Sequence, residues 1–351
     1  MRVLFVYKFL TLGGVETVLR ARIDGLAAHG IEASAWFLHD LGGRGVFAGC
    51  EDRVEVGSVE ACLDRASKSF DVLTTIDTEE VLPGLRDAPR PPRLVVECHS
   101  PYLENLEYLR SLHEHGPLAV LVPSEHQRGV VLARCDQSIS VRVVPNPLRS
   151  LFTAEPLPFP APPSTPVVAW IGRLDKLKNW RGFLAVGAAL SATNADLGLW
   201  MAGKCPTAQG ATDLFNESKR QGVLPRLRWF RGLPHDRVPG FLDAVRDSGG
   251  VVVSTSSGES FGMTVAEAMA RRCAVVAPRR PPFTEFVADG VTGSLYLHGS
   301  PADAAARVLA LVNDSATREA MGDRARRSIL AAHAPDVAIA ALARTLREVA
   351  G

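Results

Sequence analysis

Short apolar runs alternate with helix-length amphipathic stretches along this chain, and a proline-rich segment divides the alternation into two series. The first series has apolar runs at 3–6, 33–38, 72–76, 94–98 and 120–123. The second has runs at 167–171, 197–202, 227–230, 251–255, 274–277 and 294–297. Such runs with helices between them predict parallel sheets that are covered by helices on both faces. The sequence therefore predicts an α/β protein with two Rossmann-like, doubly wound domains.

The domain boundaries are expected on either side of the proline-rich segment, which has six prolines in the eleven residues 156–166. Residues 1–155 form the first predicted domain, 156–166 an exposed linker and 167–334 the second domain. A last helical pattern covers 335–351. Ligands of open α/β sheets bind beyond the carboxyl ends of the strands, so residues at strand ends and helix starts are the functional candidates.

Composition excludes several classes of protein. With 46% hydrophobic and 22% charged residues, the chain has the balance of a globular protein rather than a disordered one. A formal net charge of +1 gives no global field for nucleic acid. No apolar run approaches the roughly 20 residues that span a bilayer. The six cysteines include no Cys-x-x-Cys pair, which indicates reduced thiols without a zinc site. We expect a cytoplasmic protein and leave peripheral membrane attachment open.

The strongest functional signal lies in the segment Ser256–Ala270. A buried strand ends in a Ser/Gly-rich loop, and a helix begins near Gly262. Backbone amides and the positive end of the helix dipole at such a point suit a diphosphate. Glu259 lies in the loop, and Glu267 lies within the helix. Either glutamate alone is more often a solvated surface charge, but the pair in this context can accept hydrogen bonds from sugar or ribose hydroxyls.

A second signal follows the first strand of the second domain, in the segment Gly172–Asn179. Arg173 and Lys178 stand five residues apart in this strand-end loop. Two cations so placed can hold a diphosphate and stabilise its charge as it leaves. Alone, the segment would equally suit a capped strand with solvent-exposed charges, but the glutamate pair favours the functional interpretation.

Two weaker signals lie at strand ends of the first domain. Gly13 and Gly14, followed by Glu16, come after the first strand, where glycine lets the backbone approach a ligand and the helix start favours an anion. This is not the Gly-x-Gly-x-x-Gly dinucleotide fingerprint, which argues against a dehydrogenase. His99 follows a later predicted strand, and a lone histidine is more often structural than catalytic.

The spacing Glu259-x7-Glu267, with Phe-Gly inside it and Glu-Ala-Met-Ala at its end, resembles the E-x7-E motif of retaining glycosyltransferase family 4, which has the GT-B fold. The resemblance extends over nearly the whole chain. The segment from Gly172 to Lys178 is similar to the family's G-R-L-x-x-x-K, and the segment from Gly13 to Glu16 is similar to its G-G-x-E. It implies two Rossmann-like domains facing each other across a cleft, with the final helix, 335–351, packing back on the first domain.

The resemblance also implies roles for individual residues. The first glutamate contacts the donor sugar, the second contacts the nucleotide ribose, and the histidine lies near the donor sugar. The implied catalytic residues are His99, Arg173, Lys178 and Glu259. The implied donor-binding residues are Gly13, Gly14, Glu16, Gly172, Ser260, Phe261, Gly262, Met263, Thr264 and Glu267.

The implied reaction moves a sugar from a nucleoside diphosphate to an acceptor hydroxyl with retention at the anomeric carbon. The acceptor (a glycan, a lipid or a small molecule) is not identified by the sequence, and neither are the base and the sugar of the donor. No Asp-x-Asp metal motif stands at a strand end. We therefore expect no metal and no cofactor, with Arg173 and Lys178 in the place of Mg²⁺.

The sequence departs from the family pattern after the next strand. Pro281-Pro282-Phe283-Thr284-Glu285 stands where the family has Gly-Gly-x-x-Glu, and Arg272 and Ala274 replace a glycine and a proline. Two alternatives stay open. One is a sugar-nucleotide epimerase of the same architecture, which would convert its substrate without an acceptor. The other is a non-catalytic protein that binds a nucleotide sugar.

Overall fold

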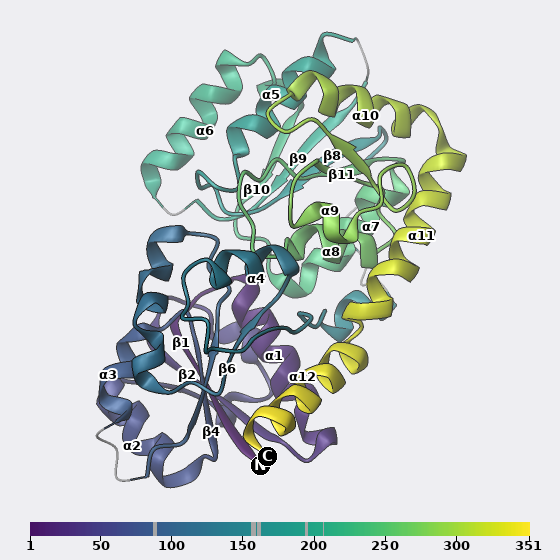
Figure 1. Ribbon diagram of the computed structural model, residues 1–351. Coiled ribbons are helices and arrows are strands. Elements are labelled where there is room, and N and C mark those ends of the chain that lie inside the picture. Colours follow the sequence, from purple (N-terminus) through teal and green to yellow (C-terminus); the bar gives the residue numbers. More distant parts are fainter. Residues whose placement is uncertain (87–89, 156–158, 160–162, 194–195, 206) are drawn as a thin grey trace. The chain divides into compact units, whose positions relative to one another are not determined.

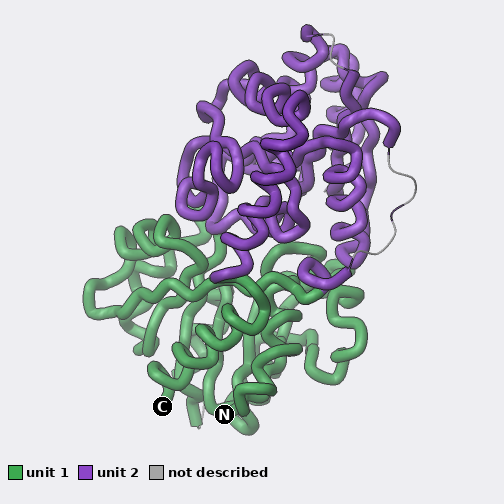
Figure 2. Tube along the Cα trace, turned by 90° about the vertical axis from the view of Figure 1, so that its right-hand side faces the viewer, with its two compact units in different colours: residues 1–150, 332–351 green, residues 151–331 purple. Residues whose placement is uncertain are grey.

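The computed structural model describes residues 1–86, 90–155, 159, 163–193, 196–205 and 207–351 (Figure 1). Contacts divide the chain into two compact units (Figure 2). Unit 1 comprises residues 1–150 and 332–351, and unit 2 comprises residues 151–331. Most of the linker expected at 156–166, namely 156–158 and 160–162, lies outside the described residues.

Unit 1 contains a seven-stranded parallel sheet in the order β3-β2-β1-β4-β5-β6-β7. Its strands are β1 (Arg2–Leu10), β2 (Glu32–Asp40), β3 (Val54–Val56), β4 (Val72–Ile76), β5 (Arg93–Glu97), β6 (Ala119–Val122) and β7 (Val141–Val143). Its helices are α1 (Gly14–Leu26), α2 (Val59–Ser69), α3 (Leu82–Leu85), α4 (Glu125–Leu132) and α12 (Pro335–Ala350). The strand order reverses between β1 and β4, which is the doubly wound arrangement predicted from the sequence.

The two faces of β1 explain its continuous apolar run. Val3 and Phe5 belong to one buried cluster, together with side chains of α1 and α12. Leu4 and Val6 belong to a second cluster, together with side chains of α2 and α3. Because successive side chains of a strand point to opposite faces, a strand covered by helices on both sides must be apolar at every position.

Helix α12 packs beside α1 within unit 1 (Figure 1). A Cβ at Gly25 would lie 3.0 Å from Cγ1 of Ile339, so the two helices approach closely at this glycine. The span Ser315–Ala350 has the length and apolar composition of a membrane-crossing helix. Within that span, Ile339, Leu342 and Leu346 of α12 are buried in the core of unit 1.

Unit 2 contains a six-stranded parallel sheet in the order β10-β9-β8-β11-β12-β13. Its strands are β8 (Val167–Ile171), β9 (Gly198–Ala202), β10 (Leu227–Phe230), β11 (Val251–Val253), β12 (Val275–Pro278) and β13 (Ser294–Tyr296). Its helices are α5 (Trp180–Ser191), α6 (Ala208–Arg220), α7 (Val238–Asp247), α8 (Met263–Ala270), α9 (Phe283–Phe286), α10 (Pro301–Asn313) and α11 (Ser315–His333), the last of which ends in the second segment of unit 1. The strand order reverses between β8 and β11, so the loops that follow these two strands lie side by side at the carboxyl edge of the sheet.

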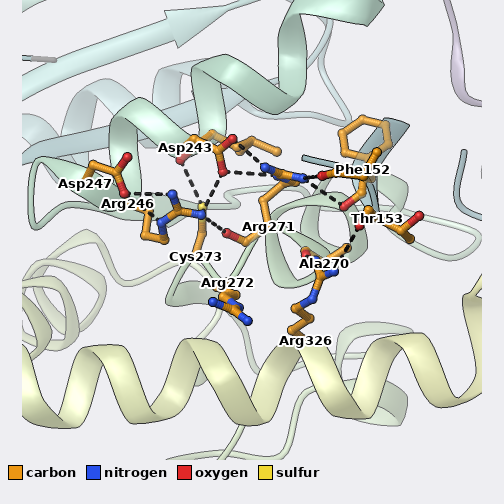
Figure 3. A network of polar contacts seen from close by, with 12 residues as sticks. Phe152, Thr153, Asp243, Arg246, Asp247, Ala270, Arg271, Arg272, Cys273 and Arg326 are labelled. Atoms are coloured by element: carbon orange, nitrogen blue, oxygen red, sulfur yellow. Dashed lines mark hydrogen bonds and ion pairs between the residues drawn. The ribbon is translucent and has the colours of Figure 1, made fainter. Parts of the chain in front are cut away.

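A buried ion pair fixes the carboxyl end of α8 against α7 (Figure 3). The Arg271 guanidinium donates to both carboxylate oxygens of Asp243, at 2.5 and 3.1 Å, and to the carbonyl of Ala154 at 2.6 Å. Arg246 donates to the same carboxylate at 2.7 Å. Arg271 and Asp243 are 4% and 5% exposed. The network therefore anchors the carboxyl end of α8. The candidate motif lies at the other end, where the helix begins.

Candidate functional site

The loops that follow β8 and β11 are joined by backbone and side-chain hydrogen bonds. The Asn179 side chain accepts a bond from the Gly182 amide at the start of α5, and it donates to the Thr255 carbonyl at 3.1 Å. The Ser257 amide donates to the Leu177 carbonyl at 2.7 Å. These contacts hold the two candidate segments of unit 2, residues 172–179 and 256–270, against each other.

Lys178 and Glu259 form an ion pair in this junction. Nζ of Lys178 lies 2.5 Å from Oε1 of Glu259, and the Ser256 hydroxyl donates to the same oxygen at 2.8 Å. The two side chains are 21% and 12% exposed. A partly exposed ammonium group that pairs with one carboxylate oxygen can still donate two hydrogen bonds to an anion. The structure thus brings together a cation and a carboxylate that are 81 residues apart.

Arg173 lies in the same loop but is more exposed. Its Nε is 3.1 Å from Oδ2 of Asp175, and its side chain is 62% exposed. Gly172, at the end of β8, lets the loop fold tightly, because a Cβ there would lie 3.0 Å from the Trp170 ring and 3.4 Å from Cβ of Lys178. Asp175 holds the loop by accepting a bond from the Lys178 amide at 2.8 Å.

Helix α8 begins at Met263 with Gly262 as its N-cap, close to the start that the sequence predicted. Gly262 has φ of 101°, a conformation that favours glycine, and a Cβ there would lie 2.8 Å from the Phe283 ring. The Phe283 contact shows that the segment Pro281–Glu285, which departs from the family pattern, packs directly on the start of α8.

The amino-terminal end of α8 has no side-chain cap. The amides of Val265 and Ala266 bond to the Gly262 carbonyl, at 3.0 and 3.2 Å. Those of Met263 and Thr264 have no acceptor among the residues that the structure describes. Unpaired amides at the positive end of a helix can bind an anion.

The residues before Gly262 complete this loop. Ser260 is partly exposed. Phe261 is buried and packs on Phe286, with ring centroids 5.0 Å apart. This apolar contact holds the loop in place beside the helix start.

Glu267 lies in the second turn of α8 and is 7% exposed. Its Oε1 is 3.3 Å from Nε2 of His235, whose ring lies edge-on to Phe152 at 5.3 Å. His235 was not among the site residues predicted from the sequence. Its contact depends on how the segment after β10 packs against α8, which periodicity does not predict. The second glutamate is therefore buried, with a histidine as neighbour.

In unit 1, Gly13 and Gly14 lie at the start of α1, also as expected from the sequence. Gly13 is the N-cap residue and no side chain caps the helix. Glu16 is 1% exposed, and its carboxylate accepts bonds from the amide and the hydroxyl of Thr11. The carboxylate thus folds back onto the loop that precedes the helix and orders it.

His99 follows β5 and contacts a buried ion pair. Its Nε2 lies 2.9 Å from Oε2 of Glu97, and both oxygens of Glu97 accept bonds from Nη1 of Arg22 at 2.8 Å. Burial opposes ionisation of Glu97, but the charge of Arg22 and the hydrogen bond from His99 hold its pKa below the ordinary value. The Arg22–Glu97 pair was not foreseen, although a signal existed: Arg22 lies on the buried stripe of α1 between Leu19 and Leu26.

Asp77 fixes the backbone at the same strand end. The His99 amide donates to both of its carboxylate oxygens, at 3.1 and 3.0 Å. Burial raises the pKa of Asp77 to about 6, although the nearby His99 acts in the opposite direction. The loops after β4 and β5 are thereby tied together.

The predicted residues form two groups, one in each unit. Unit 1 holds Gly13, Gly14, Glu16 and His99, and unit 2 holds Gly172, Arg173, Lys178, Glu259, Ser260, Phe261, Gly262, Met263, Thr264 and Glu267. Within the described part of the chain, no group of three or more His, Cys, Asp or Glu side chains could hold a metal ion.

Comparison with known proteins matches residues 155–328 to the family "Glycosyl transferases group 1". Curated relatives include the D-inositol 3-phosphate glycosyltransferases of Corynebacterium kroppenstedtii and Corynebacterium glutamicum. The first is 30% identical over 45% of this chain and 35% of its own length. The second is 33% identical over 47% of this chain and 39% of its own length. The chain thus aligns with well under half the length of these relatives.

Solved structures resemble the whole chain at low identity. Anabaena HepE, solved with UDP and glucose, has a TM-score of 0.85 at 18% identity, covering 99% of this chain and 100% of HepE. Sucrose-phosphate synthase from Thermosynechococcus elongatus has a TM-score of 0.82 at 16% identity, covering 99% of each chain. These likenesses confirm the predicted two-domain α/β fold. Residues 155–328 are thus similar to the group 1 glycosyltransferases, and the fold of the chain is GT-B, as the resemblance implied.

Proposed function

We propose that the chain is a retaining glycosyltransferase that moves a sugar from a nucleoside diphosphate sugar to an acceptor hydroxyl. The observation that carries the proposal is the start of α8, where the unpaired amides of Met263 and Thr264 lie in a segment flanked by the two motif glutamates. The named relatives support it, because the corynebacterial proteins are glycosyltransferases by name and HepE was solved with UDP and with UDP-glucose. No observation favours the epimerase or the non-catalytic alternative.

The donor diphosphate would bind at the positive end of α8. Its oxygens would accept hydrogen bonds from the free amides and from the ammonium group of Lys178, with Arg173 adding a second positive charge from the same loop. Glu267 would accept bonds from the ribose hydroxyls, and Glu259 from the hydroxyls of the sugar. Because Glu259 pairs with Lys178, the sugar and the diphosphate would be held by groups that already lie in contact.

Transfer would proceed on one face of the sugar. As the bond between the anomeric carbon and the phosphate oxygen breaks, negative charge grows on that oxygen, and the two cations would stabilise it. The acceptor oxygen would bond to the anomeric carbon from the same face, and its proton would pass to the departing phosphate oxygen. The products are a glycoside of retained configuration and a nucleoside diphosphate. These cations would supply the charge that Mg²⁺ provides in other enzymes, and the acceptor would be a glycan, a lipid or a small molecule.

The two glutamates are expected to affect different kinetic constants. Glu267→Gln should mainly raise the donor KM, because the ribose changes little between ground state and transition state. Glu259→Gln should mainly lower kcat, because the ring and charge of the sugar change during the reaction. Each lost hydrogen bond should cost about 1–3 kcal/mol, or roughly 5- to 150-fold. The measurement is steady-state kinetics with the donor found by screening UDP-, GDP-, ADP- and dTDP-sugars.

Glu319→Gln is the matched control, because this exposed glutamate of α11 lies outside the site and should leave both constants unchanged. Circular dichroism checks that each variant folds. An identical pattern in the two site variants would refute the division of roles, and parent-like kinetics in both would remove the support that the motif gives to the proposed function.

A further inference from the structure

We propose that Glu97 and Arg22 are positioning residues that hold His99 in a single tautomer, with its proton on Nε2 and the lone pair of Nδ1 available. The catalytic importance of this tautomer rests on the proposed function and on the catalytic role that the family resemblance implies for His99. The tautomer itself is a property of unit 1 and can be measured without turnover.

The geometry leaves His99 one choice. Its Nε2 lies 2.9 Å from a carboxylate oxygen of Glu97, and the Glu97 side chain is 1% exposed. An ionised carboxylate only accepts hydrogen bonds, so the ring nitrogen that faces it must carry the proton. The backbone of His99 is fixed as well, because its amide donates to Asp77.

Arg22 keeps Glu97 in the ionised form. Its Nη1 lies 2.8 Å from both oxygens of Glu97, and its side chain is 1% exposed. The guanidinium cannot lose its proton under ordinary conditions, so it offers a permanent positive charge to the buried carboxylate. Arg22 also lies over the Phe5 ring, at 5.2 Å from its centroid, which holds the guanidinium in place.

A purely structural role explains these contacts poorly. Nε of Arg22 is buried and has no partner among the described residues, so the ion pair is not fully satisfied. A buried pair with an unsatisfied donor stabilises a fold less well than apolar side chains of similar volume would. A role in orienting the His99 ring would explain why the Arg22–Glu97 pair is present, whereas its contribution to packing does not.

Replacement of Glu97 by glutamine tests the proposal, because it should change which ring nitrogen of His99 carries the proton. Arg22 would still donate to the remaining side-chain oxygen of the new amide. The amide NH₂ would then face Nε2 of His99, and that nitrogen would have to accept. The proton of the neutral ring would move to Nδ1, although size and shape at position 97 are almost unchanged.

The test is long-range ¹H–¹⁵N correlation NMR of the histidine rings at a pH where His99 is neutral. His99→Gln identifies the signals of His99 among the nine histidines. The parent should show the Nε2–H tautomer, and Glu97→Gln should show the Nδ1–H tautomer. Glu32→Gln, which changes an exposed glutamate at the start of β2, should match the parent. An Nδ1–H tautomer in the parent, or an unchanged tautomer in Glu97→Gln, overturns the proposal. An Nδ1–H tautomer in the parent overturns the proposal even if the variant does not fold.

Kinetics form the second arm. Glu97→Gln should lower kcat by about tenfold or more while changing the donor KM little. The ring keeps its position in this variant, but its proton is on Nδ1 and no longer on Nε2. A parent-like kcat together with a switched tautomer would overturn the catalytic part of the proposal. A parent protein that binds no nucleotide sugar would refute the proposed function instead, and the NMR result would still stand.

Discussion

Asp243→Ala is expected to lower the free energy of unfolding of unit 2 by about 3–5 kcal/mol, because it leaves the buried guanidinium of Arg271 without its counter-charge. Arg271 is 4% exposed and donates to both oxygens of Asp243. The loss should appear as a fall in the melting temperature of unit 2 of roughly 6–20 °C. The measurement is calorimetric unfolding, with the two units followed as separate transitions where they resolve.

Asp247→Ala is the matched control for this prediction. Asp247 lies one turn further along α7 and pairs with Arg246 at 2.8 Å, but its side chain is 55% exposed. Its removal should cost less than about 1 kcal/mol, as is usual for exposed pairs. Equal effects of the two substitutions would show that the Arg271–Asp243 pair does not anchor α8.

Lys178→Met is expected to weaken nucleoside diphosphate binding by roughly 10- to 150-fold and to lower turnover at least as much. A charge-assisted hydrogen bond contributes about 1.5–3 kcal/mol, and this cation would act both on the bound diphosphate and on the charge that develops as it leaves. Lys178 is the cation of its loop that contacts Glu259. Calorimetric titration with the nucleoside diphosphate and steady-state kinetics give the two readings.

Lys176→Met provides the comparison, since it removes the same charge from an exposed position two residues earlier in the same loop. It should change binding by no more than about twofold, because exposed charges are screened. Parent-like affinity in Lys178→Met would take this lysine out of the donor site. Equal losses in both variants would mean that the loop attracts the ligand only through its overall charge.

The sheets were predictable because their strands are buried on both faces. The continuous apolar run of β1 and the alternation after it specify a doubly wound sheet, and the strands of unit 2 lie at the predicted places. The edge strands β3 (Val54–Val56) and β7 (Val141–Val143) were not predicted, because each has three residues and carries a charged side chain at its centre. Such short segments have no periodicity to detect.

The candidate site was predictable where it depends on local sequence. The start of α8 beside Gly262 follows from a glycine after a buried strand. The contact of Lys178 with Glu259 was not predicted, because it depends on the adjacency of β8 and β11. The neighbours of the site depend on packing between elements that are distant in sequence. The contact of His235 with Glu267 is of this kind, and so is the contact of Arg22 with Glu97. A charge inside an apolar stripe is a detectable signal that a buried partner exists, but it does not identify the partner.

Binding of nucleoside diphosphates to the parent protein tests the central claim most directly. Isothermal titration with UDP, GDP, ADP and dTDP should show that at least one of them binds with one-to-one stoichiometry. Arg173→Ala should weaken that binding, because this residue lies in the same loop as Lys178. If none of the four nucleotides binds to the folded parent protein, the start of α8 is not a donor site and the account of this chain as a nucleotide-sugar transferase is contradicted.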